Sequence, residues 1–248
     1  MAEGTGNADR PTIVLVHGAF ADGSGWNGVI ERLQKQGYTV VAPPNPLRGV
    51  VADSDYIASV LGQIDGPVLL VGHSYGGAVI TNAATDAPNV LGLVYVAGFA
   101  PDGGERLGEV AADSKDSVLN SALVQTAFPA GNGETSAEFA IDPAQFRDAF
   151  AGDVPEEQTV LMAVTQRPIA AAAFSDQSGP PAWKSLPSWA VVATGDKTIG
   201  TDLVRSMAQR AGADIVEVEG SHVIMISEPQ AVTDVILKAA QAVATSAR

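Results

Sequence analysis

The chain has 248 residues, of which 46% are hydrophobic and 17% are charged, and its formal net charge is −14. This length and apolar content are typical of one globular domain with a large core, and they exclude intrinsic disorder. The acidic balance argues against a nucleic-acid partner, because the chain repels phosphate backbones. With no cysteine and three histidines, the chain lacks a disulfide framework, a thiolate nucleophile and the common histidine metal motifs. We therefore predict no metal and no cofactor.

The sequence shows no signal for a membrane. The first ten residues, MAEGTGNADR, have no apolar core, and no uninterrupted apolar run reaches about 18 residues. We therefore expect a cytoplasmic protein that has no membrane partner.

Short apolar runs alternate with amphipathic stretches of helix length over the first hundred residues. This pattern is typical of a parallel sheet that helices cover on both faces. The expected elements, in chain order, are strand Thr12–Val16, helix Ser24–Gln36, strand Tyr38–Val41, helix Ser54–Ile64, strand Pro67–Gly72, helix Tyr75–Thr85 and strand Leu91–Ala97.

The middle third of the chain, residues 101–185, interrupts this alternation. It has polar loops, one of them at Gly131–Glu134, and two helical stretches at Pro143–Ala151 and Pro155–Gln166, but no clear strand. A structureless stretch of this length is unusual inside a compact domain, so we interpret it as an inserted helical cap.

The alternation resumes after the cap, so the core comprises residues 1–100 and 186–248. The last helix has its apolar residues at helical spacing, which predicts a buried face. Together the segments predict an α/β fold with about six parallel strands. The expected elements of this part are strand Ser188–Thr194, helix Thr201–Ala211, strand Asp214–Val218 and a last helix from Glu228.

The segment Gly72-His73-Ser74-Tyr75-Gly76 matches the G-x-S-x-G pattern of a nucleophile elbow. A strand that turns sharply into a helix strains its apex residue, and the residues two positions away need to lack side chains. The bare pattern is weak in a chain with 26 glycines, but here it follows a predicted strand and opens a predicted helix. We interpret Ser74 as a nucleophile. The alternative is a tight turn with an idle serine.

A serine nucleophile needs a general base and an acid that orients the base. His222 follows the last predicted strand, whereas the other two histidines belong to glycine turns. The chain order serine, acid, histidine requires an acid between the other two residues. Asp196, which follows a predicted strand, is the preferred acid, and Asp102 is its rival.

The first predicted strand ends at the same edge of the sheet, in the turn His17-Gly18-Ala19-Phe20. Backbone N–H groups in such a turn can point at a developing oxyanion. We assign the oxyanion hole to the amides of Ala19 and Tyr75. The alternative is a glycine-containing turn without a catalytic role.

A competing motif follows the same strand. The segment Gly23-Ser-Gly25-Trp-Asn-Gly28 spells G-x-G-x-x-G, the fingerprint of dinucleotide-binding sites. Its glycines begin seven residues beyond the strand, and the second strand ends in Ala42-Pro43-Pro44, where a ribose-binding acid is needed. The sequence therefore favours a hydrolase over a nucleotide-binding protein.

These motifs together resemble the α/β-hydrolase superfamily, and the resemblance covers essentially the whole chain. Within it, the chain is similar to the small esterases that include plant methyl esterases and hydroxynitrile lyases. The resemblance implies a site at the topological switch point of the sheet. The shared segments are His17–Ala19, Gly72–Gly77, Thr194–Ile199 and Gly220–Val223.

Three departures bear on the activity. Hydroxynitrile lyases of this group have a lysine where this chain has Val223 and a threonine where it has Gly18, and dehalogenase relatives need an aspartate at the position of Ser74. We therefore expect a carboxylesterase that forms an acyl-enzyme with small to medium neutral, apolar or aromatic esters. A perhydrolase, lactonase or C–C hydrolase with the same triad, and a non-catalytic small-molecule receptor, are the alternatives.

Substrate choice is expected to depend on the cap and on side chains that flank the serine. The alternative for each cap side chain is a place in the cap's own core. The acidic chain is expected to disfavour anionic esters. The large side chains expected to line the pocket are Phe20, Phe128, Phe146, Met162, Trp183, Ile199 and Val223.

Overall fold

The computed structural model describes residues 10–131 and 133–246. Most of the N-terminal segment in which no signal peptide is expected lies outside the described residues. In the described part of the chain, no helix is both long and apolar enough to cross a membrane.

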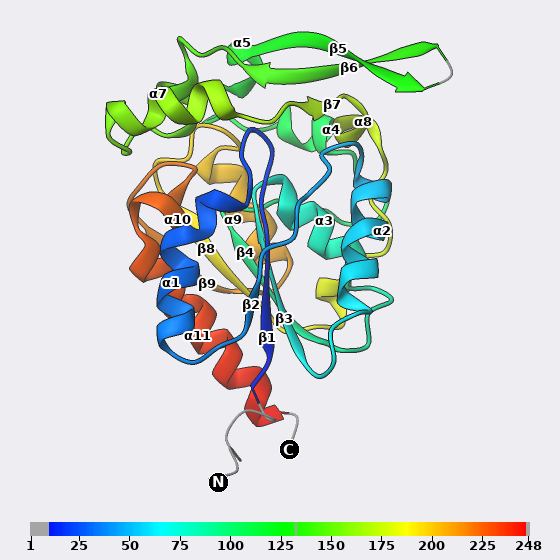
Figure 1. Cartoon of the computed structure of the whole chain (residues 1–248), viewed down its shortest axis with the longest axis vertical. Helices are drawn as coiled ribbons and strands as arrows, with labels where there is room; N and C mark the ends of the chain where they lie inside the picture. Colours follow the sequence, from blue (N-terminus) through cyan, green and yellow to red (C-terminus); the bar gives the residue numbers. More distant parts are fainter. Residues whose placement is uncertain (1–9, 132, 247–248) are drawn as a thin grey trace, which may run out of the picture.

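A six-stranded parallel sheet lies at the centre of the molecule, in the order β2-β1-β3-β4-β8-β9 (Figure 1). The predicted α/β fold with six parallel strands is confirmed, and each strand agrees with its predicted position to within two residues. β3 and β8 are buried at every residue, because helices cover both faces of the sheet. The strands are β1 (Thr12–Val16), β2 (Val40–Val41), β3 (Val68–His73), β4 (Val90–Val96), β8 (Ser188–Ala193) and β9 (Asp214–Val218).

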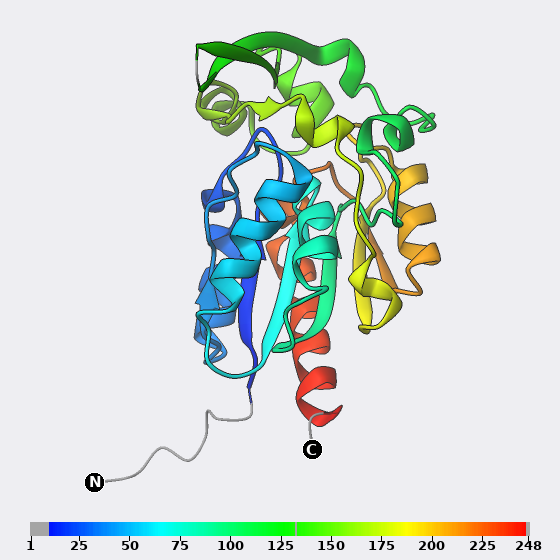
Figure 2. The ribbon, with the colours of Figure 1, turned by 90° about the vertical axis from the view of Figure 1, so that its right-hand side faces the viewer.

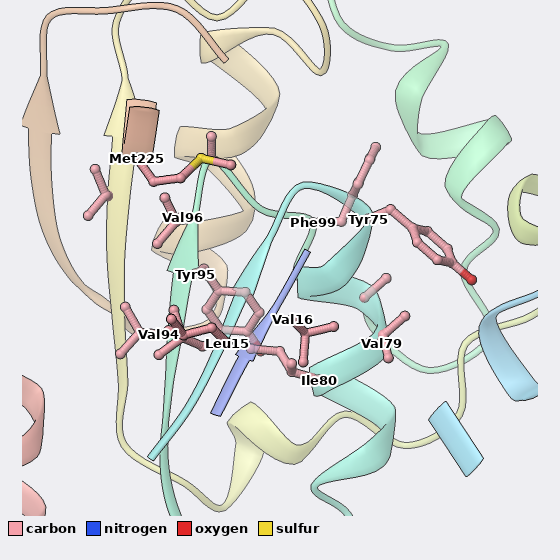
Figure 3. Packing of buried hydrophobic residues seen from close by; sticks show 14 of the residues in the cluster. Leu15, Val16, Tyr75, Val79, Ile80, Val94, Tyr95, Val96, Phe99 and Met225 are labelled. Atoms are coloured by element: carbon pink, nitrogen blue, oxygen red, sulfur yellow. The ribbon is translucent and has the colours of Figure 1, made fainter. Parts of the chain in front are cut away.

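Helices pack on the two faces of this sheet (Figure 2). α1 and α11 contact each other on one face, α2 and α3 contact each other on the opposite face, and α9 packs against β8. Val79 and Ile80 of α3 lie beside Leu15 and Val16 of β1 in the core (Figure 3). The helices of the core are α1 (Asn27–Lys35), α2 (Val50–Leu61), α3 (Tyr75–Ala83), α9 (Thr201–Arg210), α10 (Ile224–Ser227) and α11 (Pro229–Ser246).

The segment that spells the dinucleotide fingerprint forms η1 (Gly23–Trp26), a short 3-10 helix, and the start of α1. Trp26 of η1 is fully buried. The glycines of this segment thus belong to the packing of a helical turn several residues beyond β1.

Most of the chain between β4 and β8, about residues 107–175, forms the cap, which lies over the carboxyl ends of the core strands (Figures 1 and 2). The expectation of a purely helical cap is wrong, because a three-stranded antiparallel sheet, β5-β6-β7, lies beside the predicted helices. The elements of the cap are α4 (Leu107–Ala111), α5 (Leu119–Ala122), β5 (Leu123–Gly131), β6 (Glu134–Ile141), α6 (Phe146–Phe150), α7 (Glu156–Thr165), β7 (Ile169–Ala170) and α8 (Ala172–Ser175). After α8 the chain runs back beside the core, where η2 (Ala182–Lys184) contacts α3, before it enters β8 (Figure 2).

β5 and β6 form a hairpin where the sequence predicts a polar loop. An Asn-Gly pair between two runs is a hairpin signal, and Gly131 and Gly133 have positive φ values of 98° and 81°. Most residues of β5 are exposed and only one residue of β6 is buried, so burial on one face does not impose an alternation of apolar and polar residues on these strands. Arg48 attaches the hairpin to the core, because its guanidinium is 2.8 Å from Glu138 Oε2 and 4.2 Å from the centre of the Phe128 ring.

Candidate active site

The turn from β3 into α3 is a strained elbow with Ser74 at its apex. Ser74 has φ 54° and ψ −125°, a conformation that costs a non-glycine residue about 1–3 kcal/mol. The elbow closes because its glycines lack side chains. A Cβ at Gly72 would lie 2.5 Å from the carbonyl oxygen of Gly76, and a Cβ at Gly76 would lie 2.5 Å from that of Val16. The elbow thus places Ser74 at the carboxyl end of the sheet, directly before α3.

Ser74, His222 and Asp196 form one hydrogen-bonded chain. His222 Nε2 lies 2.8 Å from Ser74 Oγ, and His222 Nδ1 lies 2.8 Å from Asp196 Oδ2. All three residues are buried. A carboxylate only accepts, so Nδ1 donates a hydrogen bond to Asp196, and the Nε2 lone pair accepts a hydrogen bond from the Ser74 hydroxyl. In this arrangement the imidazole can remove a proton from the serine hydroxyl.

The loop after β8 holds Asp196 in place. Asp196 Oδ1 accepts hydrogen bonds from the amides of Thr198 and Ile199, at 2.8 and 3.1 Å, which leaves Oδ2 for His222. The rival acid, Asp102, is instead paired with Lys184, with Oδ1 2.5 Å from Nζ. The structure therefore brings Asp196, and not Asp102, to the histidine.

The amides of Ala19 and Tyr75 flank Ser74. β1 and β3 are hydrogen-bonded neighbours, so the turn after β1 lies beside the elbow. A Cβ at Gly18 would lie 2.6 Å from Ser74 Cβ, which shows how closely that turn approaches. Neither amide donates a hydrogen bond to another residue in the described part of the chain. Both amides are therefore without a hydrogen-bond acceptor, and their role as an oxyanion hole stays a prediction.

The side chain of Tyr75 extends toward α2 (Figure 3). Its hydroxyl donates a hydrogen bond of 2.7 Å to Asp53 Oδ2. Burial raises the pKa of the Asp53 carboxyl, and burial together with this carboxyl raises the pKa of the Tyr75 hydroxyl well above its ordinary value. The ring thus belongs to the packing between α2 and α3, and only the backbone of Tyr75 borders the site.

Buried phenylalanine rings cover His222. The ring centroid of Phe150, in α6, lies 5.3 Å from that of the His222 imidazole. The same ring packs on Phe146 and Phe20, with centroid distances of 5.0 and 6.0 Å. Phe20 and Phe146, which are predicted pocket residues, therefore lie in this aromatic cluster. Phe150 is not among the predicted residues, although its spacing of four from Phe146 places both rings on one face of a helix.

A cavity of about 440 Å³ lies between the cap and the edge of the sheet. Two of its lining residues hydrogen-bond to the triad, because the Phe99 amide donates to the carbonyl oxygen of Ser74 at 3.1 Å and the Thr198 amide donates to Asp196, although none of the three triad residues lines it. No ionisable side chain lines it, and none of its lining residues is among the predicted pocket residues. Its larger side chains are Phe99, Leu119, Leu123, Phe139 and Phe174.

The predicted pocket residues lie at several different places. Phe20 and Met162 line a second cavity of about 50 Å³. Ile199 and Val223 are buried next to the acid and the base.

Phe128 and Trp183, two further predicted pocket residues, line neither cavity. Phe128 packs under the guanidinium of Arg48, and Trp183 Nε1 donates a hydrogen bond of 2.9 Å to the carbonyl oxygen of Pro101. Spacing along the chain does not distinguish such anchoring residues from those that line a cavity.

Hydrogen bonds join the cap to each of the three loops of the site, which are the turn after β1, the loop of Asp196 and the loop of His222. Three of them, one for each loop, have their acceptor in the cap. They run from the Phe20 amide to the Arg167 carbonyl at 3.1 Å, from the Thr198 hydroxyl to the Ala149 carbonyl at 2.7 Å, and from the Ser221 amide to Asp153 Oδ2 at 2.9 Å.

Comparisons with known proteins identify the family. The model of the alpha/beta hydrolase family matches residues 13–235. A carbendazim hydrolyzing esterase of Nocardioides sp. (strain SG-4G) is 38% identical over 107 residues, which cover 38% of this chain and 44% of the esterase. In that match and in three others, the aligned part spans less than half of the relative's length.

Two further comparisons extend over nearly the whole chain. Methylesterase 7 of Arabidopsis thaliana is 25% identical over 94% of this chain and 97% of its own length. The crystal structure of polyneuridine aldehyde esterase covers 93% of this chain and 99% of its own, with a TM-score of 0.78 and 20% identity, a likeness that shows the fold alone. The chain belongs to the alpha/beta hydrolase family.

Proposed function

We propose that this protein is a serine esterase. Ser74 is the nucleophile, His222 is the general base and acid, and Asp196 orients the imidazole. The observation that carries the proposal is the buried chain of two 2.8 Å hydrogen bonds that begins at the strained elbow. The names of two relatives, a carbendazim hydrolyzing esterase and Methylesterase 7, support the same reaction class.

The reaction proceeds through an acyl-enzyme. Ser74 Oγ attacks the ester carbonyl carbon while His222 Nε2 takes the hydroxyl proton, and the amides of Ala19 and Tyr75 donate to the resulting oxyanion. The tetrahedral adduct expels the alcohol, which receives the proton from His222. Water then attacks the acyl group as His222 takes its proton, and the acid is released with Ser74 restored. Asp196 stays ionised and stabilises the imidazolium.

The substrates we propose are neutral esters of small to medium size with an apolar or aromatic group. The cavity of about 440 Å³ is in the range of small-molecule sites, roughly 300–1,000 Å³, and its larger side chains are apolar or aromatic. An anionic group would find no cationic side chain in this lining, and the net charge of −14 would repel it.

The test is hydrolysis of p-nitrophenyl esters from acetate to octanoate by the wild type and by Ser74→Ala. We expect the variant to lose at least about 10³-fold in kcat, because the acyl-enzyme cannot form. Ser59→Ala, which removes an exposed hydroxyl on α2, is the matched control and should keep full activity. Equal activity of Ser74→Ala and the wild type would refute the assignment of Ser74 as the nucleophile. A folded wild type that hydrolyses none of these esters would refute the proposed esterase function.

A further inference from the structure

His73, the residue before Ser74, is a buried histidine that the proposed reaction does not use. Its side chain has no exposed surface, and its Nε2 lies 3.0 Å from the carbonyl oxygen of His222. A carbonyl oxygen only accepts, so His73 Nε2 carries a proton and donates it. Two consecutive residues of the elbow thus contact the same histidine. Ser74 contacts its ring, and His73 contacts its backbone.

The environment of His73 makes it a fixed donor rather than a proton carrier. Burial, and after it the charge of His222, holds the pKa of His73 well below its ordinary value, so the ring stays neutral. With the proton on Nε2, Nδ1 is left as a lone pair, and it has no hydrogen-bond partner in the described part of the chain. A Cβ at Gly18 would lie 3.1 Å from this atom, so the turn after β1 closes that side of the ring.

The backbone of His222 has few other anchors. Among the described residues, no other group hydrogen-bonds to its amide or carbonyl. The ring of His73 also packs on that of His222, with centroids 4.8 Å apart, and Trp26 meets the His73 ring edge-on at 6.3 Å. The hydrogen bond from the cap that lies nearest to the His222 backbone runs from the Ser221 amide to Asp153, and its acceptor is a carboxylate that is exposed to water.

We propose, on the basis of the proposed function in which His222 is the base, that His73 is a positioning residue for His222. By donating to the His222 carbonyl, it fixes the backbone from which the imidazole reaches both Ser74 and Asp196. Such control matters for the rate, because a displacement of about 1 Å in a reacting group can cost about 10²-fold.

Two substitutions separate the hydrogen bond from the volume of the ring. His73→Met fills the space without a donor, and His73→Gln keeps a donor near the place of Nε2. We expect His73→Met to lower kcat for a p-nitrophenyl ester roughly 10- to 100-fold while KM changes by less than about twofold, and His73→Gln to recover most of the loss.

Tyr95→Phe is the matched control for the loss of a buried hydrogen bond. It removes the contact of 2.9 Å between the Tyr95 hydroxyl and Thr81, in the core and away from His222. We expect it to lower Tm and to leave kcat unchanged. A fall in kcat of His73→Met that is no larger than that of Tyr95→Phe would overturn the proposal.

Two readouts do not depend on ester turnover. They are the low-field proton resonance of the hydrogen bond between His222 Nδ1 and Asp196, and the rate at which a fluorophosphonate modifies Ser74. We expect His73→Met to broaden or abolish the resonance and to slow the modification, and His73→Gln to retain both. If the wild type hydrolyses no ester, the proposed function fails, and these readouts still test His73.

An unchanged resonance and an unchanged modification rate in His73→Met would overturn the positioning role, as would a loss that His73→Gln does not reverse. If His73→Met does not fold, His73→Asn replaces it. The asparagine amide takes the place of Nδ1 and is too short to reach the carbonyl of His222, so the same losses are expected. Wild-type values in His73→Asn would overturn the proposal.

Discussion

The edge of the sheet and the cap both contribute to the candidate site, but the backbone is closely packed at the edge of the sheet and more exposed in the cap. Around the elbow, the backbone packs so closely that a single Cβ at Gly72 or Gly76 would collide with a carbonyl oxygen, and β3 is buried throughout. In the cap, most residues of β5 are exposed, and the cavity wall consists of side chains. If the proposed function holds, we expect backbone geometry in the core to determine the reaction and exchangeable side chains of the cap to determine which substrate fits.

Gly76→Ala tests the close packing of the elbow and has the largest expected effect. The new Cβ would lie 2.5 Å from the carbonyl oxygen of Val16, so the elbow must open. We expect the free energy of unfolding to fall by about 3 kcal/mol or more in urea titrations. Gly62→Ala, at φ −65° and with its nearest contact at 3.6 Å, is the control and should change stability by less than about 1 kcal/mol. Similar values for the two variants would contradict the packing argument.

The dependence of stability on pH also tests the edge of the sheet, because the three buried histidines all lie there. Burial lowers the pKa values of His17 and His73 below the ordinary value of 6.5, whereas in the unfolded chain both take up protons as the pH falls through that value. The unfolded state then binds more protons, so stability that is present above pH 6.5 is lost on acidification.

Urea titrations between about pH 7.5 and about pH 5 measure this loss, with a slope of at most about 1.4 kcal/mol per pH unit for each histidine. His73→Gln, which cannot titrate, should have a smaller slope. A free energy of unfolding that does not change over this range would show that the buried rings are protonated in the folded protein.

Much of the core could be predicted because close packing restricts which residue types can stand at a position. Buried strands require apolar runs, the elbow requires glycines two residues from Ser74, and parallel strands bring Ser74, Asp196 and His222 to one edge. The β5–β6 hairpin is less restricted, because its exposed faces do not select for alternating residues. The sequence places His73 in a glycine turn, and only the distance of 3.0 Å between its Nε2 and the His222 carbonyl oxygen reveals the contact.

Phe139→Ala tests the cap side chains that line the cavity and has the smallest expected effect. Phe139 lines the cavity and packs edge-on against Phe174 at 6.0 Å. We expect kcat/KM for the octanoate ester to fall roughly 10-fold and that for the acetate ester to change by less than about threefold. Val124→Ala, at an exposed position of the same hairpin and outside the cavity, is the control. If both variants lower octanoate hydrolysis equally, the acyl chain binds elsewhere.

The hydrogen bonds between the cap and the three site loops have a consequence for protein engineering. The cap is not an interchangeable module, because its residues Arg167, Ala149 and Asp153 accept hydrogen bonds from the turn after β1, from the loop of Asp196 and from the loop of His222. A cap grafted from a relative would need acceptors at the same three places. Swapping caps to broaden the substrate range of this scaffold would therefore alter turnover as well, and selection for a new substrate has to act on both properties together.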